Sequence, residues 1–205
     1  MEKIYYYPVW IRVWHTINAL TCILLIVTGV SMQYSSLEHP LIRFDLAVAW
    51  HNIAGIVLTG NFLIFFIGNI IFVNGSYYKI HWKGFGTNLL NQSRYYLFGI
   101  FTHKKPPYPI NKTRKFNPLQ QLSYVFVMYG FVPALFITGW ALLFPGIVVN
   151  DLFGSKGLFI TDLLHVIAGF IVSLFMIVHI YFCTIGHKVS SHFKAMITGY
   201  HEVHE

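Results

Sequence analysis

Charged residues are scarce in this chain of 205 residues. Asp, Glu, Lys and Arg together make up 10% of it, whereas a typical soluble domain has about 25%. Acidic residues number only seven, and 56% of the chain is hydrophobic. This composition excludes an ordinary soluble domain and predicts a membrane protein. The formal net charge of +7 does not indicate a nucleic-acid-binding protein, because basic residues beside apolar spans mark cytoplasmic loops.

Cysteine is also rare. The chain has two cysteines, Cys22 and Cys183, and both lie inside apolar runs. No CxxCH motif occurs, so a covalently attached c-type haem is not indicated. No CxxC pair occurs either, so the cysteines do not indicate a zinc or iron–sulfur site.

Long apolar runs are what the chain has instead. Four of them are long enough to cross a bilayer as helices, at about residues 14–32, 46–73, 119–144 and 161–186. We therefore predict an all-α integral membrane four-helix bundle that forms one domain over residues 1–205. The stretch 76–101 mixes aromatic and basic residues, so the segment 74–118 is expected at the membrane interface.

The distribution of basic residues predicts the orientation of the bundle. Twelve of the fourteen Lys and Arg residues lie in the N-terminal stretch, the segment 74–118 and the C-terminal tail. Only Arg43 and Lys156 lie on the other side of the predicted bundle. Because cytoplasmic loops carry an excess of Lys and Arg, we expect both termini and the segment 74–118 in the cytoplasm.

Four of the eleven histidines belong to the apolar runs, where ionisable groups are costly and indicate function. His15 should lie near the cytoplasmic face, and His51 and His165 near the outer face. His179 follows His165 by fourteen residues, which is close to four helical turns and roughly 21 Å along the axis. Sorted by depth, His51 faces His165 and His15 faces His179. Paired imidazoles on opposite helices are the axial ligands that a b-type haem needs.

Histidines inside apolar helices do not by themselves require a haem. Each could simply form a hydrogen bond with a neighbouring helix. The chain could also be a transporter with a histidine-lined path or a membrane anchor without a cofactor, although a transport path would be expected to carry carboxylates as well. Room for a porphyrin between the helices could come from glycines, namely Gly29, Gly55, Gly139 and Gly169.

Two short patterns recur along the chain. HNIAGIV begins at His51 and HVIAGFI at His165, and the Thr28-Gly29 pair in the first apolar run matches Thr138-Gly139 in the third. The chain could therefore consist of two related helical hairpins. Alternatively, the matches reflect only that Thr, Ala and Gly are common in packed membrane helices.

The stretches RVWHTINALTCILLIVTG, WHNIAG, FNPLQQLSY and HVIAG carry a family resemblance. With a second histidine fourteen residues after His165, the pattern resembles the di-haem cytochrome b subunits of bacterial respiratory enzymes over nearly the whole chain. That group includes the gamma subunit of formate dehydrogenase, thiosulfate reductase cytochrome b and the cytochrome b subunit of nickel–iron hydrogenase. The four-span plan resembles the first two more than the last.

The resemblance implies a quinone-reactive electron-transfer subunit of the bacterial inner membrane rather than a complete enzyme. It implies two haem b groups, with His15 and His179 as ligands of the cytoplasmic iron and His51 and His165 as ligands of the periplasmic iron. The implied partners are membrane lipid, menaquinone or ubiquinone, a periplasmic iron–sulfur or multihaem cytochrome c subunit, and an associated catalytic subunit. No nucleic acid is expected.

The resemblance also suggests residues for the quinone. The family has an N-x-x-Q pattern before the third span, which Asn117 and Gln120 match here. The same two residues could instead form a helix cap, with Asn117 as N-cap, Pro118 at the first helical position and Gln120 as capping-box partner. Arg12, Arg114 and Lys115 are candidates for contacts with haem propionates, and ordinary positive charge on the cytoplasmic side explains them equally well.

Overall fold

The computed structural model describes residues 2–36, 38–111, 114–152, 155–185 and 188–203. The chain divides into two compact units, which we describe separately. The helical unit consists of residues 9–66 and 131–182, and the terminal unit of residues 1–8, 67–130 and 183–205.

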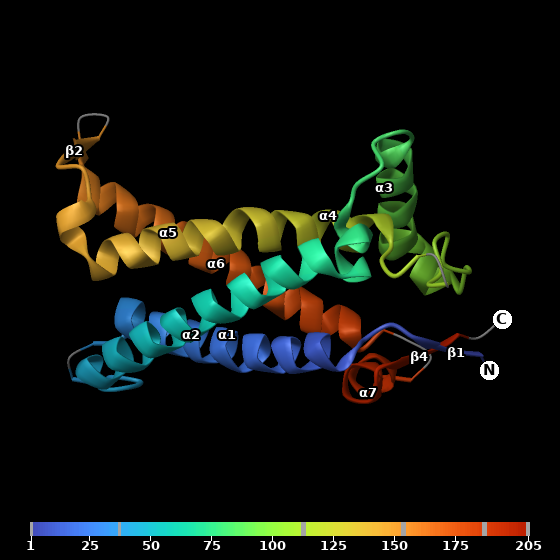
Figure 1. Cartoon of the computed structure of the whole chain (residues 1–205), viewed down its shortest axis with the longest axis horizontal. Helices are drawn as coiled ribbons and strands as arrows, with labels where there is room; N and C mark the ends of the chain where they lie inside the picture. Colours follow the sequence, from blue (N-terminus) through green and yellow to red (C-terminus); the bar gives the residue numbers. More distant parts are fainter. Residues whose placement is uncertain (1, 37, 112–113, 153–154, 186–187, 204–205) are drawn as a thin grey trace. The chain divides into compact units, whose positions relative to one another are not determined.

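Four helices in the described part of the chain are long and apolar enough to cross a membrane. They confirm the all-α architecture and lie close to the predicted spans (Figure 1). Their bounds are α1 Val9–Tyr34, α2 Phe44–Ile71, a third span Pro118–Leu143 and α6 Gly157–Cys183. The predicted end of the last span at residue 186 lies outside the described residues.

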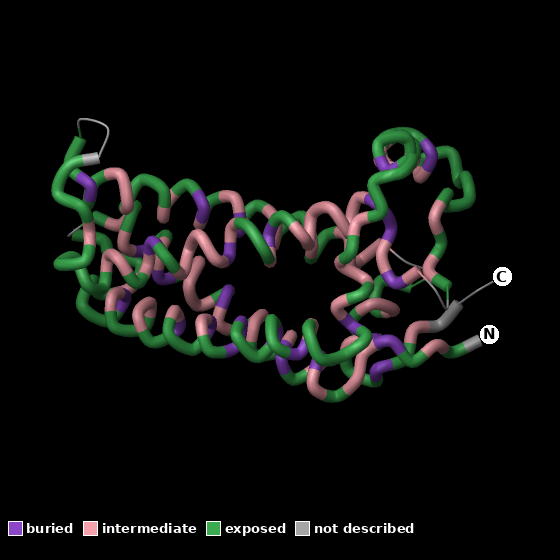
Figure 2. The backbone as a smooth tube through the Cα atoms, turned by 45° about the horizontal axis from the view of Figure 1, so that its top comes forward, coloured by how far each residue is buried: buried purple, intermediate pink, exposed green. Residues whose placement is uncertain are grey.

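These helices bury little of their own surface. Between 11% and 33% of the most apolar stretch of each span is buried, and Figure 2 shows exposed positions all along the helices. Large side chains such as Ile70 and Phe170 are about two-thirds exposed or more, at 71% and 67%. So much exposed apolar surface is stable in contact with lipid rather than water. The exposure pattern therefore supports the assignment of the four helices as membrane spans.

The third span is not a uniform α-helix. It consists of α4 (Pro118–Phe126), a π-helical segment η4 (Val127–Phe131) and α5 (Val132–Leu143). Pro133 lies in the first turn of α5, and it has no N–H for the regular hydrogen-bond ladder. The wider π turn accommodates this missing donor, and such segments are common at functional sites.

The second span ends two residues before the predicted residue 73. Asn74 donates through Nδ2 to Asn69 Oδ1 at 2.7 Å, which turns the chain back towards the last turn of α2. A Cβ atom at Gly75 would clash with the Asn69 carbonyl, so the turn requires a glycine. The 3₁₀ helix η1 (Val73–Tyr78) follows.

The remaining elements are short. The segment between the second and third spans holds α3 (Phe85–Arg94), the π-helical η2 (Tyr95–Gly99) and the 3₁₀ helix η3 (Ile100–Thr102). The 3₁₀ helix η5 (Pro145–Ile147) and the strands β2 (Asp151–Leu152) and β3 (Ser155–Lys156) join α5 to α6. The helix α7 (Ser191–Thr198) precedes the last strand.

The two ends of the chain pair with each other in the terminal unit. Strand β1 (Glu2–Tyr5) runs antiparallel to β4 (Tyr200–Val203), with Tyr5 opposite Tyr200 (Figure 1). Both termini therefore lie on the same side of the membrane, as an even number of crossings requires. Whether this side is the cytoplasm remains a prediction.

Candidate functional site

His51 and His165 face each other in the helical unit. His51 lies about two turns into α2, and His165 lies about two turns into α6. Their ring centroids are 6.2 Å apart, and the ring planes make an angle of 69°. The structure thus brings together the two histidines that the sequence paired at the outer side.

His15 and His179 form a second pair of the same kind. His15 lies in the second turn of α1, and His179 lies about one turn before the end of α6. Their ring centroids are 6.3 Å apart, at an interplanar angle of 53°. Both pairs therefore belong to one compact unit, and α6 contributes one member to each.

The separation within each pair suits two ligands of one metal ion. Metal–imidazole bonds are about 2.0–2.1 Å long, and the bonding nitrogen lies about 1.1 Å from the ring centroid. Two imidazoles on opposite sides of one metal atom therefore have centroids roughly 6.3 Å apart. Direct hydrogen bonds between two imidazoles would not require the same spacing at both ends of the unit. The histidine pairs accordingly fit an iron whose other ligands come from a porphyrin.

Thr28 fixes the orientation of the His51 ring. The Thr28 hydroxyl is buried and donates to the Leu24 carbonyl at 2.7 Å, and its oxygen lies 2.9 Å from His51 Nδ1. Because the hydroxyl proton is directed to the helix backbone, Nδ1–H is the donor in the second contact. His51 is then the tautomer with the proton on Nδ1, which leaves Nε2 able to bind a metal.

Thr138 repeats this arrangement in the other hairpin. Its hydroxyl donates to the Ala134 carbonyl at 2.7 Å, and its oxygen lies 2.9 Å from His165 Nδ1. The role of the two threonines was not predicted from the sequence. The sequence did contain a signal for this role. A Thr-Gly pair recurs in the helix that precedes each H-x-I-A-G pattern.

The glycines that follow these threonines contact the same rings. A Cβ atom at Gly29 would lie 3.5 Å from His51 Cε1, and one at Gly139 would lie 3.3 Å from His165 Cε1. Gly55, one turn after His51, has no atom within 4 Å of its Cβ position. Gly169 has only ordinary contact, with Leu135 at 3.9 Å. The Cβ position of Gly55 is therefore open, whereas Gly29 and Gly139 are close to the histidine rings.

Aromatic side chains surround the second pair. Phe175 stacks on His179 with centroids 5.7 Å apart, and Trp14 meets His15 edge-on at 6.3 Å. Arg12 lies three residues before His15 on α1, so the two side chains are on nearly the same face of the helix. This position is compatible with the predicted contact between Arg12 and a haem propionate, which remains a prediction.

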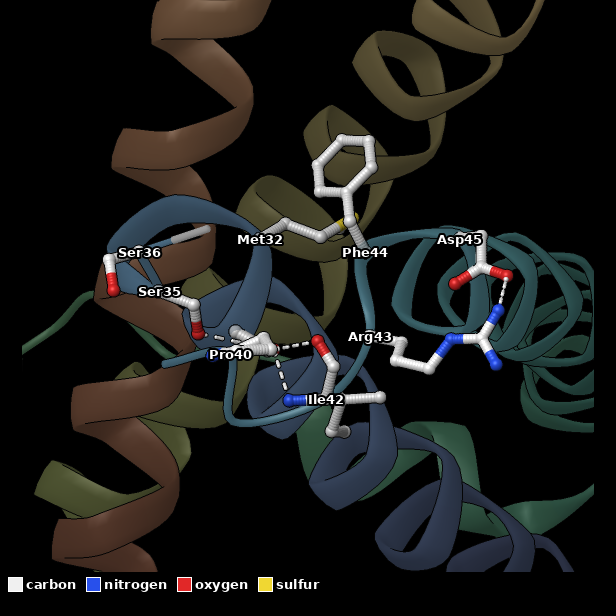
Figure 3. A pocket seen from close by; sticks show the side chains of 9 residues that line it. Met32, Ser35, Ser36, Pro40, Ile42, Arg43, Phe44 and Asp45 are labelled. Carbon is white, nitrogen blue, oxygen red and sulfur yellow. Dashed lines mark hydrogen bonds and ion pairs between the residues drawn. The ribbon is translucent and has the colours of Figure 1, made fainter. Parts of the chain in front are cut away.

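A pocket in the loop between α1 and α2 is separate from both histidine pairs (Figure 3). The Ser31 hydroxyl accepts from the Ile42 N–H at 3.0 Å, which ties the loop to the end of α1. Arg43 forms an exposed ion pair with Asp45 at 2.7 Å. The polar groups of this pocket hold the loop in place, and none of the predicted site residues lines it.

The described residues contain no group of three or more His, Cys, Asp or Glu side chains able to hold a metal ion. The intramembrane histidines therefore occur as pairs, without the third protein ligand that zinc or copper sites normally use. Each pair of imidazoles would supply the protein ligands of a haem iron, and the porphyrin would supply the other four.

Asn117 forms the helix cap that the sequence allowed. Its Oδ1 accepts from the Gln120 N–H at 2.9 Å, and Gln120 Oε1 accepts from the Asn117 N–H at 3.2 Å. Asn117 Nδ2 also donates to the Tyr96 hydroxyl at 2.9 Å. The capping box is thus complete. Whether Asn117 and Gln120 also bind a quinone remains a prediction.

Arg114 lies in the terminal unit, as do Asn117 and Gln120. Its guanidinium lies over the Tyr108 ring, 5.4 Å from the centroid. Its backbone pairs with that of Asn111. The predicted contact of Arg114 with a propionate is neither supported nor opposed by these interactions.

The four apolar helices and the paired histidines define a membrane b-type cytochrome, an electron-transfer subunit that uses haem b. Comparison with known families agrees: the model of the prokaryotic cytochrome b561 family matches residues 6–199. The chain belongs to this family, and it is a multi-pass protein of the bacterial inner membrane.

Two curated relatives illustrate the family. The putative cytochrome YdhU of Escherichia coli (strain K12) is 36% identical over 200 residues, which cover 98% of this chain and 75% of that protein. A probable Ni/Fe-hydrogenase B-type cytochrome subunit of Rhodobacter capsulatus is 29% identical over 204 residues, which cover 87% of this chain and 73% of that protein. No solved structure matches the chain.

Proposed function

We propose that this chain binds two haem b groups and transfers electrons between a periplasmic redox partner and the quinone pool. The observation that carries the proposal is the spacing of the two histidine pairs, 6.2 and 6.3 Å between ring centroids. Two pairs with nearly the same separation, placed about four turns apart along α6, provide two redox positions at different depths in the membrane.

The protein's own contribution is geometry and electronic tuning. Bound haem groups would supply one-electron redox chemistry. Thr28 and Thr138 hold the outer imidazoles in the metal-binding tautomer, and the hydrogen bonds raise the basicity of the ligands. The apolar helices exclude water from both pairs, which keeps the dielectric constant around them low.

The proposed orientation places His15, His179 and the termini on the cytoplasmic side, following the distribution of basic residues. Quinone would react on that side, with Asn117 and Gln120 as the residues suggested by the family pattern. An iron–sulfur or multihaem cytochrome c subunit would dock on the periplasmic side and connect to a catalytic subunit. The relative named as a hydrogenase cytochrome subunit supports a place in such a complex, so we propose a subunit rather than a complete enzyme.

The test is the haem content of purified histidine variants. The wild-type protein should contain two haem b groups per chain, with the absorption spectrum of bis-imidazole haem. His51→Ala and His165→Ala should each lose the same haem, and His15→Ala and His179→Ala should each lose the other. His39→Ala, which changes an exposed loop residue, should retain both. A His179→Ala protein that still contained two haem groups would contradict the pairing, and a wild-type protein without haem would reject the function.

A further inference from the structure

Lys115 is a buried cation in the terminal unit. It is 4% exposed, and its Nζ donates to Asn74 Oδ1 at 2.8 Å. The ammonium lies over the rings of Tyr7 and Tyr77, 4.7 and 5.2 Å from their centroids. No carboxylate of the described residues forms an ion pair with it. A buried charge without a counter-ion is costly, so stability does not explain this lysine.

A directional chain of hydrogen bonds begins at Lys115. Asn74 accepts from the ammonium and donates through Nδ2 to Asn69 Oδ1 at 2.7 Å. Asn69 in turn donates through Nδ2 to the Tyr129 hydroxyl at 2.9 Å. The side-chain amides of Asn74 and Asn69 thus each accept a hydrogen bond from the direction of Lys115 and donate one in the direction of Tyr129. Hydrogen bonds aligned in this way polarise one another, so the positive charge of the lysine is felt at the Tyr129 oxygen.

Tyr129, which accepts from Asn69 in this chain, lies at the surface of the third span. It lies in the π-helical segment η4, and 36% of the residue is exposed, whereas Lys115 and Asn74 are buried. A phenol at this level of a membrane helix can be reached from the lipid phase. The exposed end of the chain thus combines a hydroxyl, an adjacent amide and a nearby buried positive charge, the features that would bind the carbonyl oxygen of a lipid-soluble quinone.

We propose that the Tyr129 hydroxyl, supported by Asn69, Asn74 and the Lys115 ammonium, binds a carbonyl oxygen of the quinone. This inference rests on the proposed function. It places the quinone at different residues from the family pattern, because the Asn117 side chain is already engaged by the helix cap and by Tyr96. Reduction of the quinone to quinol takes up two electrons, which bound haem groups would supply one at a time, and two protons from water. The ammonium offsets the negative charge that develops on the oxygen.

The site should depend on pH through Lys115. Burial lowers the pKa of Lys115 to about 8, so the ammonium is charged at neutral pH and loses its charge as the pH rises above 8. In the described part of the chain, the phenols of Tyr7 and Tyr77 are the titratable groups seen against the ammonium. Burial raises the pKa of Tyr7 to about 12, so Tyr7 stays neutral over this range. Quinone binding should therefore weaken above pH 8.

The experiment uses the haem-loaded protein in nanodiscs, with its haem reduced by dithionite and the excess removed. Oxidation of the haem is followed by absorbance after addition of a short-tailed naphthoquinone or a short-tailed benzoquinone. Tyr129→Phe and Lys115→Met should each raise the quinone concentration for half-maximal rate roughly ten-fold. Haem content and spectra should be unchanged. The weakening above pH 8 should disappear in Lys115→Met.

Two further variants complete the comparison, one of them a matched control. Lys79→Met removes an exposed charge in the same unit and should leave the quinone dependence unchanged. Asn117→Asp retains an N-cap acceptor and tests the alternative in which the quinone lies at the helix cap. Tyr129→Phe removes a single oxygen atom from an exposed residue, so it carries the test if Lys115→Met fails to assemble.

The outcomes separate this inference from the proposed function. If neither quinone oxidises the wild-type haem, quinone reactivity is rejected and the site with it. If wild-type haem is oxidised and Tyr129→Phe behaves like wild type, the quinone-reactive function stands and the Tyr129 site is rejected. An effect of Asn117→Asp without an effect of Tyr129→Phe would place the quinone at the helix cap instead.

Discussion

Thr28 and Thr138 each position one histidine through a single hydroxyl group. The two contacts have the same length, 2.9 Å, and the same second hydrogen bond to the residue four positions earlier in the helix. A hydrogen bond from Nδ1–H to an oxygen makes imidazole a stronger electron donor to the metal. Stronger donation stabilises the oxidised metal, so these hydroxyls should lower the redox potential of the outer haem.

We therefore expect Thr28→Val to raise the midpoint potential of the outer haem. A lost hydrogen bond of about 1 kcal/mol corresponds to roughly 40 mV for a one-electron couple. The measurement is a redox titration of the purified protein, monitored by absorbance. Thr28→Ser retains the hydroxyl and should restore the wild-type potential. Equal potentials in the Val variant and the wild type, with both haem groups present, would show that the hydroxyl does not influence the ligand.

Lys115 should make the protein less stable at neutral pH than at alkaline pH. Burial lowers its pKa from 10.5 to about 8, a difference that corresponds to about 3 kcal/mol. Between these two values the unfolded state holds a proton that the folded state has lost, so the free energy of unfolding rises with pH through this window. The contribution of Lys115 to the free energy of unfolding should be least favourable below pH 8, because the ammonium is then charged in both the folded and the unfolded state.

Lys115→Met should consequently stabilise the protein at pH 7. We expect a gain of about 1–2 kcal/mol, because the lost hydrogen bond to Asn74 offsets part of the cost of the buried charge. Denaturant unfolding in detergent micelles, followed by tryptophan fluorescence at pH 7 and pH 10, measures the difference. The gain should shrink at pH 10. A variant that is less stable than the wild type at pH 7 would indicate that the aromatic rings compensate the charge fully.

In both helical hairpins, a Thr-Gly pair of the first helix contacts a histidine of the second helix. The end of α1 supplies Thr28 and Gly29 to His51 of α2, and the end of α5 supplies Thr138 and Gly139 to His165 of α6. In each hairpin, the threonine orients the ring and the glycine lets the two helices approach. The sequence repeat thus has a structural counterpart in the same contact, made twice.

Close approach at Gly139 should be essential for the outer histidine pair. A Cβ atom there would lie 3.3 Å from His165 Cε1, and the further atoms of a leucine would displace the ring. Gly139→Leu should reduce the haem content from two groups per chain to one, as measured by the pyridine haemochrome assay. Gly60→Leu is the matched control, because Gly60 is exposed and has no atom within 4 Å of its Cβ position. Two haem groups in Gly139→Leu would mean that the helices separate without losing the pair.

The whole molecule has a predicted orientation that membrane topology experiments can test. The pairing of β1 with β4 places both termini on one side of the membrane, and the excess of basic residues predicts that this side is the cytoplasm. A phosphatase that needs disulfides is active only in the oxidising periplasm. Fused after Gly99 it should be inactive, and fused after Lys156 it should be active. The opposite pattern would invert the placement of both histidine pairs and of the proposed quinone site.

The number of membrane helices, their approximate bounds and the histidines that face each other could all be predicted from the sequence. These features follow from local rules: about twenty consecutive apolar residues span a bilayer wherever they occur, and depth along a helix is proportional to residue number. The capping box at Asn117 was also predictable, since a cap involves residues only three positions apart.

Contacts between polar side chains of different helices could not be predicted without the folded structure. The threonine that contacts His51 lies 23 residues earlier in the chain, and the Lys115 ammonium meets an amide 41 residues away. Such contacts depend on how helices rotate and pack against each other, and residue order does not fix this rotation. For this reason Lys115 looks from the sequence like one more cytoplasmic charge, whereas in the folded chain it is buried in a hydrogen-bond network that includes Tyr129.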